Sequence, residues 1–263
     1  MKLILAIAIA LFAVVSCNNA DKKETLSMPG AYAMLSQSVN DGKKDTTYTT
    51  LKQLKIYTGD YMMYANVNPA DSVSGFGIGT YSINADSVTE NVVYNASDTS
   101  ANSSPASFSL LIEKTTRGYK QIIPEIKMGD QKLKLTEEYE TAGTAAKSAL
   151  DGAWTETKAY TIKGKDTVAN KAVQYKTYYA GHFIFGHTYA DSTKKSHTGI
   201  GYGTFEMNGT NKVKENVIAS TYSQIRGKSF DIDIEMSGTD EFKQIITDPN
   251  GDKNVEVYQR LKK

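Results

Sequence analysis

The chain has 263 residues, of which 30 are basic and 29 acidic, so that its formal net charge is only +1. The two kinds of charge are evenly mixed, and the lack of a basic stretch argues against nucleic acid as a partner. With 40% hydrophobic residues, the chain is long enough to bury one or two cores.

The N-terminal segment has the features of a cleaved secretory signal. An unbroken apolar run of 13 residues, from Leu3 to Val15, follows Met1-Lys2. A membrane span takes about 20 such residues, whereas the core of a signal peptide is shorter. Val14-Val15-Ser16-Cys17 resembles the lipobox of bacterial lipoproteins, in which the cysteine becomes the acylated N-terminus. Cys17 is the only cysteine of the chain, and its position favours this role over that of a buried free thiol.

The resemblance implies that residues 1–16 are removed and that acyl chains on Cys17 hold the protein at a membrane of the cell envelope. By analogy with lipoprotein sorting, Asn18 after the cysteine favours the outer membrane, on its periplasmic or its exposed side. Residues 17–27 are polar and charged, which predicts a flexible tether.

The rest of the chain is a tandem duplication. The two copies align at offsets of about 120 to 125 residues, which predicts one domain over 28–140, a linker over 141–149 and a second domain over 150–263. The matching segments are Met28–Tyr32 with Leu150–Trp154, Lys44–Thr46 with Lys165–Thr167, Tyr57–Tyr61 with Tyr179–Phe183, Glu90–Val92 with Glu215–Val217, Phe108–Ile112 with Phe230–Ile234, and Tyr119–Ile123 with Phe242–Ile246.

Each copy has the pattern of an all-β domain. Apolar and polar residues alternate, and turn residues recur every 10 to 15 positions. The first copy predicts strands over 31–39, 46–57, 60–67, 75–83, 87–96, 106–115, 118–126 and 131–140. The second copy predicts them over 153–162, 167–180, 182–190, 199–207, 212–221, 227–237, 241–247 and 253–261. Short connections favour antiparallel neighbours, so we expect two tandem up-and-down barrels of about eight strands each.

The connections carry further signals. Asn208-Gly209 and Asn250-Gly251 predict hairpin turns in which both central residues have positive φ. The Ser-, Asn- and Ala-rich composition of residues 98–105 predicts a loop, which has no full counterpart in the second copy. The linker over 141–149 is either flexible or a short helical turn at the base of the second barrel.

One strand of each copy carries three glycines at alternate positions, and hence has one nearly bare face. Two interpretations remain open. The glycines admit a bulky aromatic ring from inside the barrel or sharpen the bend of the strand, or they widen the interior for a ligand. Parity places Tyr81 and Phe205 inward with the glycines and sends Ile78 and Tyr202 outward, toward the other domain.

The strand before each glycine strand is apolar on both faces, which is typical of a strand between a barrel interior and a partner surface. We take the face of Tyr61 and Phe183 as the inward one. His187 then sits among aromatic rings, where a metal or haem ligand is conceivable and a hydrogen-bonded structural histidine is favoured. We expect neither a metal nor a cofactor. The candidate ligand-cavity residues are Tyr32, Tyr61, Met63, Gly75, Gly77, Gly79 and Tyr81 in the first copy, and Trp154, Phe183, Phe185, His187, Gly199, Gly201, Gly203 and Phe205 in the second.

Gly152-Ala153-Trp154 resembles the Gly-x-Trp motif of the lipocalin and calycin superfamily. This resemblance implies that Trp154 closes one end of the barrel and that Arg260, in the last strand, stacks across it. The fuller pattern is similar to the lipocalin-like domains of unknown function in secreted lipoproteins of Bacteroidetes. The first copy departs from it, because Tyr32 replaces the tryptophan and Glu138 stands where the arginine is expected.

The chain lacks the usual hydrolase, zinc-protease and phosphate-loop motifs, so we expect no enzyme. Glu90 and Glu215 recur at matched positions, either in a surface ladder, which is the default, or as an interior pair that touches a ligand. The favoured function is the binding of a small apolar or amphipathic ligand in at least one barrel, with the second as the better candidate. The alternative is a structural or interaction lipoprotein with filled barrels, whose outer face docks an envelope protein or a glycan through Ile78 and Tyr202.

Overall fold

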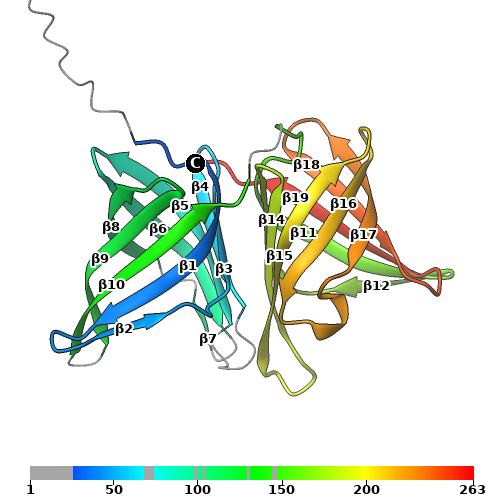
Figure 1. Ribbon diagram of the computed structural model, residues 1–263. Coiled ribbons are helices and arrows are strands. Elements are labelled where there is room, and N and C mark those ends of the chain that lie inside the picture. Colours follow the sequence, from blue (N-terminus) through cyan, green and yellow to red (C-terminus); the bar gives the residue numbers. More distant parts are fainter. Residues whose placement is uncertain (1–25, 68–73, 98–99, 103–104, 129–130, 144–146) are drawn as a thin grey trace, which may run out of the picture.

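The structure is a computed structural model that describes residues 26–67, 74–97, 100–102, 105–128, 131–143 and 147–263. It contains two closed β-barrels in tandem, which lie side by side (Figure 1). The proposed signal peptide, Cys17 and most of the tether lie outside the described residues. Leu26, which we assigned to the tether, is instead buried in the core of the first barrel.

The first barrel is an antiparallel sheet in which eight strands close by pairing of the first with the last. Around the barrel the order is β10-β9-β8-β6-β5-β4-β3-β1. These strands are β1 (Gly30–Asn40), β3 (Gln53–Tyr57), β4 (Tyr61–Asn66), β5 (Gly75–Asn84), β6 (Ser87–Ser97), β8 (Ala106–Lys114), β9 (Gly118–Met128) and β10 (Gln131–Thr141). Two short strands extend the sheet, β2 (Asp45–Tyr48) on β1 and β7 (Ser100–Asn102) on β6.

The second barrel repeats this topology in the order β11-β13-β14-β15-β16-β17-β18-β19, closed by pairing of β11 with β19. Its strands are β11 (Gly152–Lys163), β13 (Val173–Tyr179), β14 (His182–Ala190), β15 (Ser196–Met207), β16 (Lys212–Ser220), β17 (Ser229–Ser237), β18 (Glu241–Thr247) and β19 (Lys253–Arg260). A short strand, β12 (Asp166–Asn170), extends β11, and a single 3-10 turn, η1 (Ser223–Ile225), follows β16.

The predicted all-β fold of two eight-stranded up-and-down barrels is therefore confirmed, and it fits a tandem lipocalin-like arrangement. Each predicted second strand is divided in two, into β2 and β3 and into β12 and β13. The predicted turn geometry is wrong in part: Gly209 and Gly251 have positive φ, of 74° and 87°, but the asparagines before them do not. The chain from β15 to β16 accordingly takes four residues rather than two.

The glycine strands β5 and β15 owe their glycines to close packing. The Tyr64 ring covers Gly77 and the Phe185 ring covers Gly201, so that a Cβ at either glycine would overlap the ring. Opposite Gly79 and Gly203 the next strand, β6 or β16, has a bulge, and its backbone occupies the place of a Cβ. The interpretation that the glycines admit a bulky aromatic ring therefore applies to Gly77 and Gly201, and the rings are Tyr64 and Phe185.

Gly203→Ala is expected to lower the free energy of unfolding by about 1–3 kcal/mol, because the new methyl group would overlap the carbonyl oxygen of Asn216. Displacing the backbone of Asn216 costs more free energy than rotating a flexible side chain away would. Gly59→Ala is the matched control, since no heavy atom lies within 4 Å of its Cβ position. Urea unfolding of both variants checks this, and equal stabilities would contradict the packing role of Gly203.

The outer faces of β3 to β6 pack against those of β13 to β16 and form an apolar interface between the barrels. Ile78 and Tyr202 lie in it, as predicted. Tyr94 and Thr188 share a hydrogen bond of 2.6 Å across it. Phe76 lies on the backbone of Gly186, where a side chain would collide with its ring. The two barrels are therefore packed against each other through a buried surface and are not connected by the linker alone.

This interface corrects the predicted inward face of β4. Tyr61 and Met63 point outward into the interface, and Met62 and Tyr64 point into the barrel. Tyr61 donates a hydrogen bond of 2.8 Å to the backbone carbonyl of Lys262, where the C-terminal tail crosses to the first barrel (Figure 1). The interface covers the outward face of β4, and this explains why both faces of that strand are apolar.

One end of each barrel is closed by an aromatic side chain from its first strand. In the second barrel the Trp154 indole donates to Leu150 O at 2.8 Å, and the Arg260 guanidinium carbon lies 4.0 Å from the centre of the indole ring. The stacking that the lipocalin resemblance implied is thus present. In the first barrel Tyr32 takes the place of Trp154 and donates to Met28 O at 3.0 Å.

The strand partner of Tyr32 is Thr141, just as Arg260 is the partner of Trp154. Thr141 is therefore the counterpart of Arg260, and the predicted equivalence with Glu138 is wrong. The comparison of the copies misplaced it because Tyr139 follows its strand partner Tyr119 by 20 residues, whereas the equivalent Tyr258 follows Phe242 by only 16.

Candidate functional site

A layer of polar side chains crosses the interior of each barrel, and its seven members are identical in the two copies. In both barrels the residues come from four strands and point inward, above the sealed apolar end. The first layer comprises Gln53, Lys55, Tyr57, Glu90, Gln121, Glu137 and Tyr139. The second comprises Gln174, Lys176, Tyr178, Glu215, Gln244, Glu256 and Tyr258. Polar groups in a barrel interior are tolerated because they bind one another.

The first layer is a connected hydrogen-bond network. Lys55 Nζ lies 3.0 Å from Glu90 Oε1 and donates to Gln121 Oε1 at 3.0 Å. The Tyr57 hydroxyl donates to the same Glu90 oxygen. Gln121 Nε2 donates in turn to Glu137 Oε2 at 2.7 Å. The lysine, both glutamates and the glutamine are therefore linked in one chain.

The second layer repeats the same chain of contacts. Lys176 Nζ lies 2.7 Å from Glu215 Oε1 and donates to Gln244 Oε1 at 3.1 Å. Tyr178 donates to Glu215 Oε1, as Tyr57 does to Glu90. Gln244 Nε2 donates to Glu256 Oε2 at 2.7 Å. Duplicated contacts of this kind fix the orientation of each side chain in both barrels.

The tyrosines of the layer are buried next to carboxylates, and this raises the pKa of their hydroxyl groups. Burial raises the pKa of Tyr57, Tyr139, Tyr178 and Tyr258 well above the ordinary value, and the neighbouring glutamates raise it further. These hydroxyls stay protonated and act as hydrogen-bond donors. Glu90 and Glu215 are thus interior groups, and the default expectation of a surface ladder is wrong.

A cavity opens above each layer, on the side away from the sealed end. It measures about 200 Å³ in the first barrel and about 270 Å³ in the second. The polar layer forms its floor, and aromatic and aliphatic side chains form its walls. In the second barrel the wall residues are Phe185, His187, Val217, Tyr222, Ile225, Phe230, Ile232 and Ile246. All nine residues that line the smaller cavity have counterparts around the larger one.

Phe185 and His187 are the predicted cavity residues that line the larger cavity. Gly199 and Gly201 lie behind them, and Gly77 lies behind Tyr64 in the first barrel. Tyr32, Tyr81, Trp154, Phe183 and Phe205 point inward but fill the sealed halves. The remaining predicted residues do not line either cavity. Gly79 and Gly203 lie opposite bulges, and Gly75 lies next to Ser97. Tyr61 and Met63 belong to the interface between the barrels.

His187 is held as a neutral structural histidine. Its Nδ1 lies 2.8 Å from Gln174 Oε1 and its Nε2 lies 2.7 Å from the Tyr222 hydroxyl. Burial lowers the pKa of His187 to about 4. Both ring nitrogens are engaged, and the described part of the chain holds no group of three or more residues suited to a metal.

The polar layer is the part of the site that the sequence comparison missed. Its signal is present as Gln-x-Lys-x-Tyr at Gln53 and Gln174, and as Glu-x-Tyr at Glu137 and Glu256. The first motif aligns at an offset of 121 residues, as Lys44 does with Lys165, and the second at 119, compared with 123 for Tyr119 and Phe242. A search for repeated polar residues at alternate strand positions would have found them.

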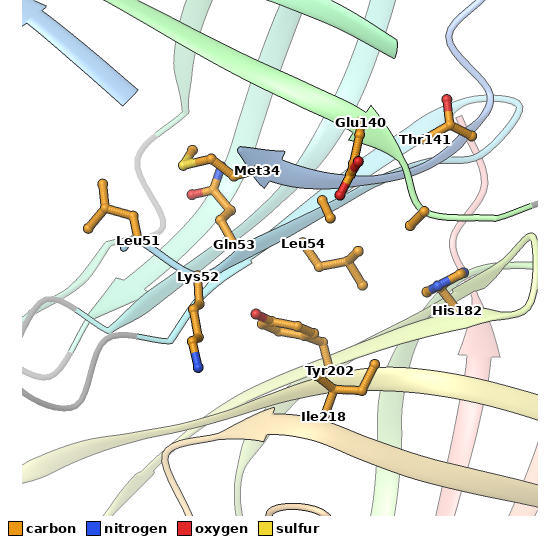
Figure 2. Close-up of a pocket in the computed structure, with 12 residues that line it drawn as sticks. Met34, Leu51, Lys52, Gln53, Leu54, Glu140, Thr141, His182, Tyr202 and Ile218 are labelled. Atoms are coloured by element: carbon orange, nitrogen blue, oxygen red, sulfur yellow. The ribbon is translucent and has the colours of Figure 1, made fainter. Parts of the chain in front are cut away.

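A separate groove runs along the seam between the barrels. It encloses about 480 Å³ between Leu51, Lys52 and Leu54 of the first barrel and His182, Tyr202 and Ile218 of the second (Figure 2). Of the fourteen residues in the two polar layers, Gln53 of the first barrel is the one that lines this groove. We therefore take the interior cavities as the candidate site.

None of the described segments forms a helix with the length and apolarity needed to cross a membrane. Comparison of the chain with known protein families finds no matching family model, and comparison with curated proteins finds no match either.

Proposed function

We propose that this protein is a lipid-anchored lipoprotein of the cell envelope, with two lipocalin-like barrels, whose second barrel binds a small amphipathic molecule. One observation carries the proposal: the cavity of about 270 Å³ has a fixed polar floor and an apolar wall. Such a cavity orients a ligand through a few polar contacts and derives affinity from apolar contact. We propose no catalytic activity for the layer.

The anchor is proposed from the sequence, with Cys17 as the lipid-bearing residue and the outer membrane as the favoured location. The second barrel is favoured over the first because its cavity is larger and because Tyr222 and Ile225, in the loop that contains η1, extend its wall. In the first barrel, Tyr64 replaces Phe185 and occupies part of the corresponding space.

The alternative of a purely structural or interaction protein has less support. Ile78 and Tyr202, which we expected to dock an envelope protein or a glycan, are buried between the two barrels. The interiors are also not filled by side chains, since both contain a cavity over the polar layer.

Mass spectrometry of the full-length protein, purified from bacterial membranes in detergent, tests both parts of the proposal. We expect the intact mass to show the loss of residues 1–16 and acylation of Cys17, because the lipobox directs both steps. We also expect a small molecule to be released stoichiometrically on denaturation.

A pair of matched variants assigns the ligand to one barrel. Ile246→Trp places an indole in the larger cavity and is expected to abolish co-purification of the ligand, whereas Ile123→Trp, at the corresponding position of the first barrel, is expected to leave it unchanged. If no small molecule is released from the wild type, or if Ile246→Trp retains it, ligand binding in the second barrel is refuted.

A further inference from the structure

We propose that the cavity of the second barrel selects a small organic cation, namely a primary amine with a compact apolar body. This inference rests on the proposed ligand-binding function and names the class of ligand. It follows from a comparison of the two layers, which share their seven residues but differ in the side chains around them.

The first difference concerns the second glutamate of the layer. In the first barrel Gln37 donates to Glu137 Oε1 at 2.8 Å, while Gln121 and Tyr139 donate to Glu137 Oε2 at 2.7 and 2.8 Å. Both carboxylate oxygens are thus covered, and Glu137 is only 6% exposed.

In the second barrel the position of Gln37 is occupied by Ala159, which faces Glu256 across the strand pair as Gln37 faces Glu137. Gln174, Gln244 and Tyr258 all donate to Glu256 Oε2. Among the described residues, none donates a hydrogen bond to Glu256 Oε1. This oxygen belongs to a residue that lines the cavity, and it has lost the donor that covers its counterpart.

The first glutamate of the layer also presents an open oxygen. Lys176 and Tyr178 both contact Glu215 Oε1, and within the described parts of the chain Glu215 Oε2 accepts no hydrogen bond. Glu215 is 5% exposed and lines the same cavity. Because Glu215 lines the cavity, this oxygen is available to accept a hydrogen bond from a bound group.

A third carboxyl group, from Glu156, adds to the negative charge of the second barrel. It stands beside Tyr258 in the position that Met34 holds beside Tyr139 in the first barrel. Glu156 and Glu256 together line a recess at the mouth of the barrel. Burial and the nearby Glu256 raise the pKa of Glu156 to about 7. A cation placed next to it would favour its ionised form.

Among the described residues that line this cavity, the basic ones are Lys176 and His187, whereas Lys171 lines the adjoining recess with Glu156. Lys176 is bound to Glu215 and Gln244, and His187 is neutral with both nitrogens engaged. An ammonium group has three donors and one positive charge, which suits the open oxygens of Glu215 and Glu256. Phe185, Phe230 and Ile246 provide the apolar wall for the rest of the ligand. An anionic ligand would be repelled by the same carboxylates.

Isothermal titration of the full-length protein with three probes of one shape tests the inference. These are 2-phenylethylamine, its neutral isostere 2-phenylethanol and the anion phenylacetate. We expect the amine to bind at least about tenfold more tightly than the alcohol, because its ammonium group adds the attraction of opposite charges to the hydrogen bonds with the carboxylates. We expect phenylacetate not to bind.

Two variants transfer the features of the first barrel to the second. Ala159→Gln supplies the donor that covers Glu256 Oε1, and Glu156→Met removes the third carboxyl group. Each is expected to weaken amine binding about tenfold while leaving 2-phenylethanol unaffected. Lys163→Gln, at the exposed end of the same strand, is the control and should leave amine binding unchanged.

The outcomes separate the inference from the proposed function. Equal or tighter binding of the alcohol or of phenylacetate would overturn selectivity for amines while supporting ligand binding. A co-purified ligand that is neutral or anionic would likewise overturn selectivity for amines and support ligand binding. If none of the probes binds and no ligand co-purifies, both the inference and the proposed function are overturned.

Discussion

Replacing Lys176 with methionine is expected to lower the free energy of unfolding by about 3–5 kcal/mol. Lys176 is 3% exposed and lies 2.7 Å from Glu215 Oε1, so its removal leaves a carboxylate buried without a counter-charge. The methionine also removes the donor to Gln244 and the cation that lies 5.0 Å from the centre of the Tyr178 ring. Guanidinium-induced unfolding measures the loss.

Two matched variants sharpen this prediction. Lys55→Met, in the first barrel, breaks the corresponding buried contact with Glu90 and should cost a similar amount. Lys212→Met breaks the exposed ion pair with Asp233 and should cost less than about 1 kcal/mol, because solvent screens that pair. If Lys176→Met proves no more costly than Lys212→Met, the polar layer does not hold the barrel together.

Trp154→Ala is expected to destabilise the protein by about 3–5 kcal/mol, because it empties the sealed end of the second barrel. Trp154 is fully buried, and its ring centre lies 4.7 Å from that of Phe242. The substitution also removes the donor to Leu150 O and the surface on which the Arg260 guanidinium stacks. Chemical unfolding followed by tyrosine fluorescence measures the effect in the absence of the only tryptophan.

Trp154→Tyr is the control, since the first barrel already closes with a tyrosine. Tyr32 donates to Met28 O as Trp154 donates to Leu150 O. The tyrosine variant should therefore retain much more stability than the alanine variant. Equal losses in the two would mean that the hydrogen bond and the remaining ring contribute nothing to closure.

The two polar layers are identical, whereas two of the inward-facing residues next to them are not. Met62 and Tyr64 of the first barrel correspond to Phe183 and Phe185 of the second, while all seven layer residues are unchanged. An apolar residue can be exchanged for another with repacking, whereas the loss of one partner leaves a buried polar group unsatisfied. We therefore expect substitutions in the layer to cost more stability than exchanges between its apolar neighbours.

The mistaken orientation of Tyr61 and Met63 has a simple physical origin. We matched Tyr57 with Tyr179, whereas the strand registers match Tyr57 with Tyr178. Tyr178 and Tyr179 are adjacent, so that the sequence offers both alignments. Because side chains alternate between the two faces of a strand, a shift by one residue exchanges the inside and the outside of the barrel.

The sequence by itself determined the duplication and the order of the eight barrel strands in each copy, and the resemblance to lipocalins implied the closure of the second barrel by Trp154 and Arg260. The duplication and the strand order follow from local alternation, turn residues and repeated motifs, which neighbouring residues specify. Only the tertiary structure decided which face of β4 points inward and which polar residues meet. The face depends on the second barrel, which covers the outside of the first. The polar layer joins residues as far apart as Gln53 and Tyr139, and only the closure of the barrel brings them within hydrogen-bond distance.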